Sequence, residues 1–516
     1  MTFAPDNKGF RLLASSDDDL YAGSQPASPA LGEFCAFLAV VVGCALLLVS
    51  LPLGGAIAFS GDEGLELGKA LLWSRGYPLY DRVWSDQPPM WTAILGFLFY
   101  CYGPSVLAAR LVVVCFALLL FGSFFALVAK RSCVWSGAVA TLLLLASPAV
   151  LQLSVSAMQE VPAFAAGLAS VWLLWRWMVV HRAYLLVASG MLMGVALAIK
   201  LTVFLLWPAI LVQIVLASRP SPVGILRSAA RAACIWASTA FGALAVFCLT
   251  LGWPHWSSMI GTHLGTGDVP GLPRPEQYGF LWPMVGHHPE TVAAALVTVV
   301  VLLFRRGLGQ IAFPLMMLLT VSGVHAVHRP VWDFYYLHLA IPLAWLAGMS
   351  VEAVLQTATQ WAESRTAYFV AARRSVWLPF GLGILGLLFV PAAPRLEAAF
   401  TDLQNRPRRQ DSAVLKLMQN HSSATRWAFS YPAVFAFHAC ALMPPELAVV
   451  SLKRFWAGQI TKEELVSTLK RYQPDQVLVP RGFLNEEWRT YADTRYSIVY
   501  DDGVQVLYML KEEGTQ

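Results

Sequence analysis

Long apolar runs alternate with short polar segments along most of this chain. The runs are about 16 to 25 residues long, which at about 1.5 Å per residue matches a hydrocarbon core of about 30 Å. By this length criterion the pattern predicts about eleven membrane-spanning helices. We place them at residues 34–59, 106–129, 134–151, 161–180, 184–199, 201–217, 232–251, 291–304, 308–323, 335–350 and 376–391.

One apolar segment, Pro88 to Tyr102, is too short to cross comfortably, because about 15 helical residues reach only about 22 Å. If it lies along the outer interface, the cytoplasmic loops hold most basic residues of the membrane part, whereas if it crosses, these residues move outside, against the positive-inside rule. They are Lys130, Arg131, Arg176, Arg182, Arg219, Arg227, Arg231, Arg305, Arg306, Arg365, Arg373 and Arg374. The charges therefore predict an interfacial helix, with the N-terminus of the chain in the cytoplasm and its C-terminus outside.

Composition agrees with an α-helical polytopic membrane protein. The 516 residues are 57% hydrophobic and 13% charged, with a mean hydropathy of +0.58, which is more apolar surface than a soluble fold of this length buries. The net charge of +5 is small and comes mostly from the loops, so it does not indicate nucleic-acid binding. The eight cysteines lie mainly in apolar runs, without the spacing of a zinc site or a disulfide framework.

The two ends of the chain differ from its apolar middle. Residues 1–32 carry three consecutive aspartates among Ser, Pro and Gly, which predicts a disordered cytoplasmic tail rather than a signal peptide. Residues 33–394 form the predicted membrane module, with a large outer loop at 60–105. Residues 395–516 are polar enough for a small soluble α/β domain on the outer, extracytoplasmic side.

Local patterns in the C-terminal stretch predict its elements. Two short runs read as strands at 426–430 and 476–480, and an amphipathic helix is predicted at 461–472. A hairpin follows, with its turn at Asp502 and Gly503. No set of catalytic residues is evident in this stretch.

The polar island Gly61 to Trp91 lies between very apolar segments and holds five carboxylates, Asp62, Glu63, Glu66, Asp81 and Asp86. Adjacent acidic residues in a regular element cannot both point the same way. One of Asp62 and Glu63 can therefore face a cavity while the other orients it or pairs with a cation. The simpler alternative is a solvated edge of a loop. Of the five, Asp62 is the preferred catalytic residue, followed by Glu63, and the others are expected to be structural.

Two further charged residues stand at predicted membrane boundaries. Glu160 enters a span from outside and is costly to bury without a partner or a water-filled cavity, although it can also simply complement the helix dipole. Lys200 sits at the tip between the spans 184–199 and 201–217. Its ammonium either reaches to the interface or faces an anionic ligand.

Two outer segments carry candidate ligand-binding side chains. The stretch 325–336 brings together His328, Arg329, Tyr335 and Tyr336, which can bind a phosphate through charge and hydrogen bonds. The alternative is an aromatic belt with an arginine that fixes topology. The Gly- and Pro-rich loop 252–290 can act as a lid, and its His255 and His263 can bind a metal ion with an outer carboxylate, at a spacing that is not diagnostic.

Taken together, several short motifs resemble the GT-C superfamily of membrane glycosyltransferases, in the branch of protein O-mannosyltransferases and bacterial aminoarabinose transferases. The motifs are G-D-E-G (61–64), Y-P-L-Y-D (77–81), D-Q-P-P-M (86–90), A-A-R-L (108–111), M-Q-E-V-P (158–162) and H-R-P-V-W-D-F-Y-Y (328–336). The resemblance implies a GT-C fold in a multi-pass plasma-membrane protein, with a bacterial inner membrane expected. It also implies a polyprenyl-phosphate sugar donor and transfer with inversion on the outer face.

The resemblance assigns roles to individual residues. Asp62 matches the general base, which takes the proton of the acceptor hydroxyl. Glu160 matches the second acidic position, near the acceptor or a possible divalent metal ion, and Asp86 is placed in the same vicinity. The donor phosphate is expected to bind Lys200, Arg329, His328, Tyr335 and Tyr336. Neither metal ligands nor the acceptor class can be carried over, so the acceptor stays open among a glycolipid, a glycan and a protein.

Two other classes compete with a transferase. A transporter or flippase of a lipid-linked or anionic substrate is expected to show paired repeats, interrupted helices and ionisable residues near the midplane. Here the carboxylates collect at one membrane face and no internal repeat is evident. An inert assembly subunit that docks partners through residues 395–516 is the third possibility.

Overall fold

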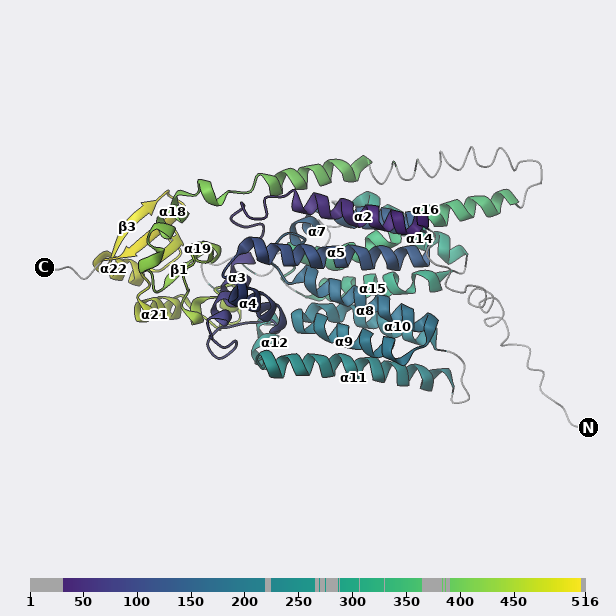
Figure 1. Cartoon of the computed structure of the whole chain (residues 1–516), viewed down its shortest axis with the longest axis horizontal. Coiled ribbons are helices and arrows are strands. Elements are labelled where there is room, and N and C mark those ends of the chain that lie inside the picture. The colour runs from purple at the N-terminus through teal and green to yellow at the C-terminus, as the bar shows by residue number, and fades with distance from the viewer. Residues whose placement is uncertain are drawn as a thin grey trace, which may run out of the picture.

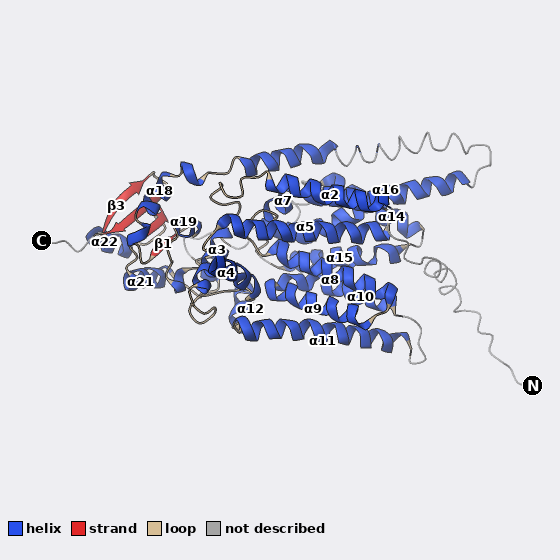
Figure 2. Ribbon diagram, viewed as in Figure 1, coloured by secondary structure: helices blue, strands red, loops and turns tan. Residues whose placement is uncertain are grey.

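A bundle of long helices carries a small α/β domain at one end (Figures 1 and 2). The computed structural model describes residues 31–218, 224–264, 288–305, 307–328, 330–363 and 390–511, together with residues 269, 274, 286, 383 and 386. The predicted tail at 1–32 and the predicted span at 376–391 lie almost entirely outside these residues. The mostly helical membrane module and the small C-terminal sheet both agree with the predicted fold class.

The helices of the bundle follow the apolar runs. They are α2 (Leu31–Val49), α3 (Glu63–Ser74), α4 (Met90–Tyr102), α5 (Val106–Arg131), α6 (Val134–Leu145), α7 (Pro148–Leu153), α8 (Glu160–Val180), α9 (Ala183–Ile199), η2 (Leu201–Leu206), α10 (Trp207–Ala217), α11 (Ile225–Leu251), α12 (Trp256–Leu264), α14 (Pro289–Phe304), η4 (Leu308–Ile311), α15 (Ala312–Val327), η5 (Asp333–Tyr335) and α16 (Tyr336–Glu363). Six of the described helical segments are long and apolar enough to cross a membrane, and five shorter apolar helices accompany them.

Three predicted spans are shorter or divided in the structure. The helix expected at 34–59 ends at Val49, because Pro52 and the following glycines turn the chain and free its carbonyls for other partners. The span at 134–151 is divided before Pro148, which starts α7 at its first position. The span at 201–217 begins as the 3₁₀ segment η2 before it continues as α10.

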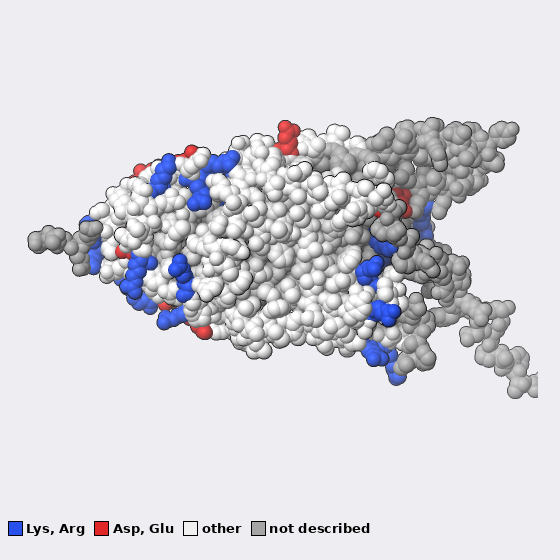
Figure 3. Space-filling model, in the orientation of Figure 1, with Lys and Arg blue, Asp and Glu red and all other residues white. Residues whose placement is uncertain are grey.

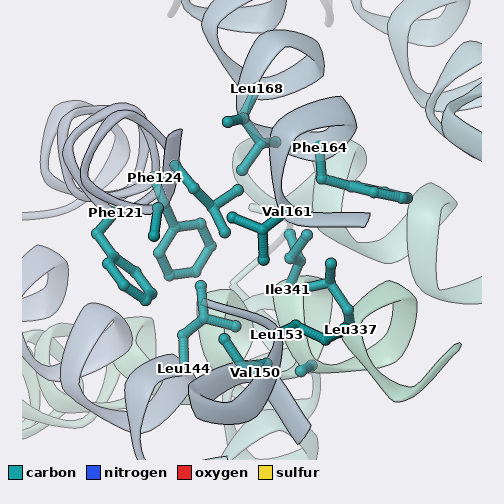
Figure 4. Close-up of a cluster of buried hydrophobic side chains, with 14 of the residues drawn as sticks. Phe121, Phe124, Leu144, Val150, Leu153, Val161, Phe164, Leu168, Leu337 and Ile341 are labelled. Atoms are coloured by element: carbon teal, nitrogen blue, oxygen red, sulfur yellow. The ribbon is translucent and has the colours of Figure 1, made fainter. Parts of the chain in front are cut away.

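Helix α16 forms the centre of the bundle, where nearly all of its apolar stretch is buried. Figure 4 shows its Leu337 and Ile341 among side chains from α5, α6, α7 and α8. The ring of Trp345, one α-helical turn further along α16, contacts aromatic rings of α5, α8 and α15. This dense apolar packing gives the N-terminal part of α16 a fixed position.

Two glycines four residues apart bring α9 close to α11. A Cβ atom at Gly190 would lie 2.5 Å from the carbonyl oxygen of Trp236, and one at Gly194 would lie 2.4 Å from that of Ala240. Small residues at this spacing let helix backbones approach closely where lipid gives no hydrophobic drive for association. The tight α9–α11 contact supports the segment that carries Lys200 at the end of α9.

Helix α4 does not cross the bundle. Residues after the end of α2 and residues at the start of α5 lie at the same end, because Arg110 of α5 donates to the carbonyls of Leu53 and Ala56 at 2.6 and 3.0 Å. Figure 1 places α3 and α4 at that end, next to the C-terminal domain. Figure 3 shows a broad, mostly white band without Lys or Arg between the basic residues of this domain and those of the opposite end, with acidic atoms only at its upper edge. The described geometry thus places α4 at one end of the bundle, and its position at a membrane interface stays a prediction.

The C-terminal domain is reached through a helix at 390–404 and contains a four-stranded sheet of order β1-β2-β4-β3. Strands β1 (Ala428–Ser430) and β2 (Gln476–Pro480) are parallel, whereas β3 (Tyr496–Asp501) and β4 (Gln505–Leu510) form the predicted hairpin. Its turn is stabilised by Asp502, whose Oδ1 accepts from the backbone of Val504 and Gln505. The helical elements are η7 (Arg409–Asp411), α18 (Ala413–Asn420), η8 (Ser422–Ala424), α19 (Val434–His438), η9 (Pro445–Leu447), α20 (Leu452–Trp456), α21 (Lys462–Tyr472) and α22 (Glu486–Arg495).

The first outer loop is the surface on which this domain docks. Gly64 of α3 packs so closely against α19 that a Cβ atom there would lie 2.3 Å from the backbone nitrogen of Val434. The His438 ring nitrogen Nε2 lies 2.7 Å from the carbonyl oxygen of Ile57. The indole of Trp84 donates to the side-chain oxygen of Gln459 at 2.9 Å. The polar island of the sequence is therefore largely enclosed between the bundle and the domain.

Candidate functional site

The adjacent acidic residues at the start of α3 lie in different environments. Glu63 is fully buried, and Nε and Nη2 of Arg110 donate to its two carboxylate oxygens, each at 2.8 Å. The backbone N–H groups of Phe59 and Ala157 donate to it as well, at 3.0 and 2.8 Å. The other donors of Arg110 bind carbonyls of the loop after α2. This geometry favours a structural role for Glu63 over the catalytic role predicted for it.

Asp62 precedes α3 and its side chain makes no capping hydrogen bond there. Among the described residues its carboxylate has no ion-pair partner within 4.0 Å, and the side chain is accessible. Nevertheless, protein surrounds it closely enough that loss of hydration raises the pKa of Asp62 to about 6. Lys453 and Lys200 lower this pKa, whereas the charges of Glu160 and Glu66 raise it. An accessible carboxylate with such a pKa suits proton transfer near neutral pH.

A buried ion pair on α3 lies next to this carboxylate. Lys69 Nζ donates to Glu66 Oε1 at 2.9 Å, and the side-chain amide of Gln159 donates to the same oxygen at 2.9 Å. The other oxygen, Glu66 Oε2, is buried and has no hydrogen-bond partner among the described residues. Because a buried acceptor without a donor costs free energy, this oxygen favours a ligand that brings one.

The second buried pair joins two predicted site residues. Lys200, at the end of α9, donates to Oε1 of Glu160, the first residue of α8. Both side chains are buried. Lys200 therefore does not reach out to the interface, which was the alternative expected from the sequence. Glu160 Oε2 has no hydrogen-bond partner in the described parts of the chain. Glu66 and Glu160 thus each have one carboxylate oxygen without a partner among the described residues, and the charges of both raise the pKa of Asp62.

Aromatic and histidine rings build one wall beside Lys200. Its Nζ lies 5.3 Å from the centre of the Phe334 ring. The neighbouring Tyr335 stacks on His325 and His338, each with ring centres 5.3 Å apart. Nε2 of His325 and Nδ1 of His338 are 3.1 Å apart and share a hydrogen bond. The predicted phosphate-binding residues Lys200 and Tyr335 therefore lie in one neighbourhood.

The C-terminal domain contributes a cation to the same neighbourhood. Lys453 of α20 donates to the hydroxyl of Tyr335, with Nζ 3.3 Å from that oxygen. Its charge is also the largest one that acts on the pKa of Asp62. No catalytic pattern is evident in the sequence of this domain, and nothing local in the sequence around Lys453 signals its position.

Other predicted residues lie elsewhere. Tyr336 stacks on His288, with ring centres 5.0 Å apart. His328 is partly exposed, with its ring centre 6.3 Å from that of Tyr335. Asp86 lies near Tyr80 in the first outer loop. The side chains of Arg329 and His263 lie outside the described residues.

The described residues do not form a metal site. His255 Nε2 lies 3.9 Å from Asp81 Oδ1, and both side chains are exposed. In the described segments no three His, Cys, Asp or Glu side chains gather closely enough to hold a metal ion. Near Asp62, Glu66 and Glu160 are each already bound by a lysine. The divalent ion therefore stays a prediction.

Arg110 is a site residue that the sequence indicates but that was not among the predicted ones. It lies in the A-A-R-L motif within an apolar run. A charged side chain in such a run requires a partner, and an acidic residue in the preceding polar island was the obvious one. The pairing with Glu63 settles which of two adjacent carboxylates is held by a cation and which is left accessible.

Comparisons with known proteins identify the fold. No family model matches the sequence, and no curated protein matches it significantly. ArnT from Cupriavidus metallidurans in the apo state superposes with a TM-score of 0.59 at 15% identity, over 93% of this chain and 98% of that chain. The same ArnT bound to undecaprenyl phosphate gives 0.58 at 14% identity, over 94% and 100%. The Archaeoglobus fulgidus oligosaccharyltransferase in the apo form gives 0.56 at 12% identity, over 92% and 74%.

At these identities the comparisons establish the fold. This chain is a multi-pass membrane protein with the GT-C fold that the motifs predicted, and the similarity to ArnT extends over nearly the whole of both chains. The C-terminal domain is included in that similarity, since the match covers 93% of this chain.

Proposed function

We propose that this protein is a glycosyltransferase that moves a sugar from a polyprenyl-phosphate donor to a hydroxyl group of an acceptor, with inversion at the anomeric carbon. The observation that carries the proposal is Asp62, an accessible carboxylate without an ion-pair partner whose pKa is raised to about 6. It stands beside two lysines in a fold shared with an ArnT that binds undecaprenyl phosphate. The reaction takes place at the outer face of a plasma membrane.

In the proposed reaction Asp62 is the general base. The acceptor oxygen attacks the anomeric carbon and forms the new glycosidic bond while its proton passes to the Asp62 carboxylate. The bond between the anomeric carbon and the phosphate oxygen breaks on the opposite side. Its electron pair stays on that oxygen, so polyprenyl phosphate leaves with more negative charge than it had in the donor.

Glu66 and Glu160 position the sugar or the acceptor. Each has one oxygen fixed by a lysine and one buried oxygen without a hydrogen-bond partner among the described residues. Hydroxyl groups are donors that can fill both positions. Lys200 stays close to the leaving phosphate and orients Glu160 through their ion pair. Membrane lipids and the lipid-linked donor are the implied partners, and the acceptor is a glycolipid, a glycan or a protein.

The direct test uses purified protein in lipid nanodiscs with a panel of polyprenyl-phosphate sugars and follows release of polyprenyl phosphate. Asp62→Asn should lower turnover by at least about a hundredfold, because the variant lacks a general base. Asp81→Asn is the matched control, since Asp81 is an exposed carboxylate of the same loop and should leave turnover unchanged.

Two results would contradict the proposal. One is the absence of release with every donor in the panel, together with movement of the lipid between leaflets, which would indicate a transporter or flippase. The other is an Asp62→Asn variant that turns over like the natural protein, which would remove Asp62 from the mechanism.

A further inference from the structure

Lys453 is a cation that the C-terminal domain delivers to the site. Its Nζ donates to the Tyr335 hydroxyl at 3.3 Å and lies 5.8 Å from the ring centres of both Trp332 and Tyr335. These two aromatic residues belong to the bundle, on the segment that leads into α16. The ammonium therefore stands at the seam between the two parts of the molecule, and only the docked domain places it there.

The charge of Lys453 is not neutralised by an ion pair. In the described parts of the chain no carboxylate lies within 4.0 Å of its Nζ, whereas Lys69 and Lys200 are paired with Glu66 and Glu160. The side chain is half-buried, which reduces the screening of its charge by water. Of the three lysines that this site assembles, Lys453 is the one whose charge is still available to an anion.

Several contacts hold α20 in place so that Lys453 is preorganised. Trp456 stacks on Trp332 with ring centres 6.0 Å apart. The guanidinium of Arg454 lies 5.2 Å from the centre of the Trp84 ring, and its Nη1 donates to two backbone carbonyls of its own domain. A cation that is fixed before the ligand arrives pays little reorganisation cost when it binds charge.

We propose that the Lys453 ammonium and the Tyr335 hydroxyl form a subsite for the phosphate group of the lipid carrier. This inference rests on the proposed function, which it deepens: the C-terminal domain completes the active site. As the bond between the sugar and the phosphate breaks, the electron pair moves to the phosphate oxygen and its negative charge grows. Lys453 binds that oxygen more strongly as the charge develops, and thereby accelerates the departure of polyprenyl phosphate.

The test measures binding and turnover for Lys453→Met and Lys453→Arg in the full chain. The methionine variant should bind polyprenyl phosphate about ten- to hundredfold more weakly and lose turnover by a similar factor, as expected for a charge-assisted hydrogen bond. The arginine variant keeps the charge and should recover most of the binding. Lys470→Met is the matched control, because Lys470 also lies over a tyrosine ring of this domain but is paired with Glu487.

A pH profile separates this role from a merely structural one. Because Lys453 lowers the pKa of Asp62, its removal should move the acid limb of the activity profile to higher pH. A second arm replaces polyprenyl phosphate by inorganic phosphate. Binding of both with the same dependence on Lys453 supports a subsite for phosphate itself, and binding of the lipid alone supports one that also needs the chain.

The outcomes distinguish this inference from the proposed function. Normal lipid-phosphate binding, turnover and pH profile in Lys453→Met would overturn the subsite while leaving the transferase intact. Absence of sugar transfer in the natural protein would contradict the proposed transferase function. Binding of polyprenyl phosphate that still depends on Lys453 would then support the subsite as part of a lipid-binding protein. If the methionine variant unfolds, Lys453→Gln and the arginine variant provide the same comparison.

Discussion

Asp62 and Glu63 are neighbours in the chain with opposite surroundings. Glu63 is buried, bound by both prongs of Arg110 and by two backbone N–H groups. Asp62 is accessible, without an ion pair in the described structure, and its pKa is raised to about 6 by the protein around it. Glu63 holds the start of α3 in place through its contacts. The adjacent Asp62 therefore has a fixed position while its carboxylate stays accessible.

The largest effect is expected on stability, when Arg110 no longer binds the buried Glu63. Arg110→Met leaves the Glu63 carboxylate buried without its cation, which should lower stability by about 3 to 5 kcal/mol. Thermal unfolding in detergent, followed by tryptophan fluorescence, measures the loss. The double variant with Glu63→Gln should be less destabilised than the sum of the two single variants, because the two side chains are coupled. A Tm equal to that of the natural protein would show that the pair is not structural.

Replacement of Asp62 should have the opposite effect, with a loss of turnover and no loss of stability. Asp62→Asn removes a charge that has no ion-pair partner in the described structure, so the Tm should not fall, while turnover falls by about a hundredfold or about 2.7 kcal/mol. Thermal unfolding and donor turnover measured on the same preparation give both numbers. If Asp62→Asn were as destabilised as the Arg110 variant, the contrast between the two carboxylates would be lost.

The contact between α3, which begins next to Asp62, and α19 of the C-terminal domain can be tested through Gly64. Gly64→Ala places a methyl group against the backbone of Val434 and should disturb the docking of the C-terminal domain at a cost of about 1 to 3 kcal/mol. Gly68→Ala on the same helix is the control, since a Cβ atom there meets nothing within 4 Å. Limited proteolysis between the bundle and the domain reports docking. Equal protection of the two variants would contradict the close α3–α19 contact.

The smallest effect is the pH dependence of the reaction. Asp62 must be ionised to accept a proton, and its pKa is raised from the usual range to about 6. Turnover should therefore be constant above this pH and fall about tenfold per pH unit below it. An acid limb near the ordinary aspartate pKa, measured on initial rates, would mean that Asp62 is more hydrated than its surroundings indicate.

The sequence alone determined the membrane class, the positions of most helices and the strands of the C-terminal domain. Apolar length, loop charge and turn residues are local properties, and they act over the span of one element. The motifs also led to the GT-C fold and to Asp62. What they left open was the physical difference between Asp62 and Glu63, since both have the same chemistry at neighbouring positions.

Only the tertiary structure showed that difference, because it pairs Glu63 with Arg110, and it added Lys453. Arg110 lies far along the chain from Glu63, and Lys453 is separated from Tyr335 by more than a hundred positions. No local pattern encodes which cation meets which carboxylate, because the pairing follows from how the helices pack and how the domain docks. Through those contacts, two adjacent carboxylates of the polar island differ: Glu63 is buried and structural, whereas Asp62 is accessible.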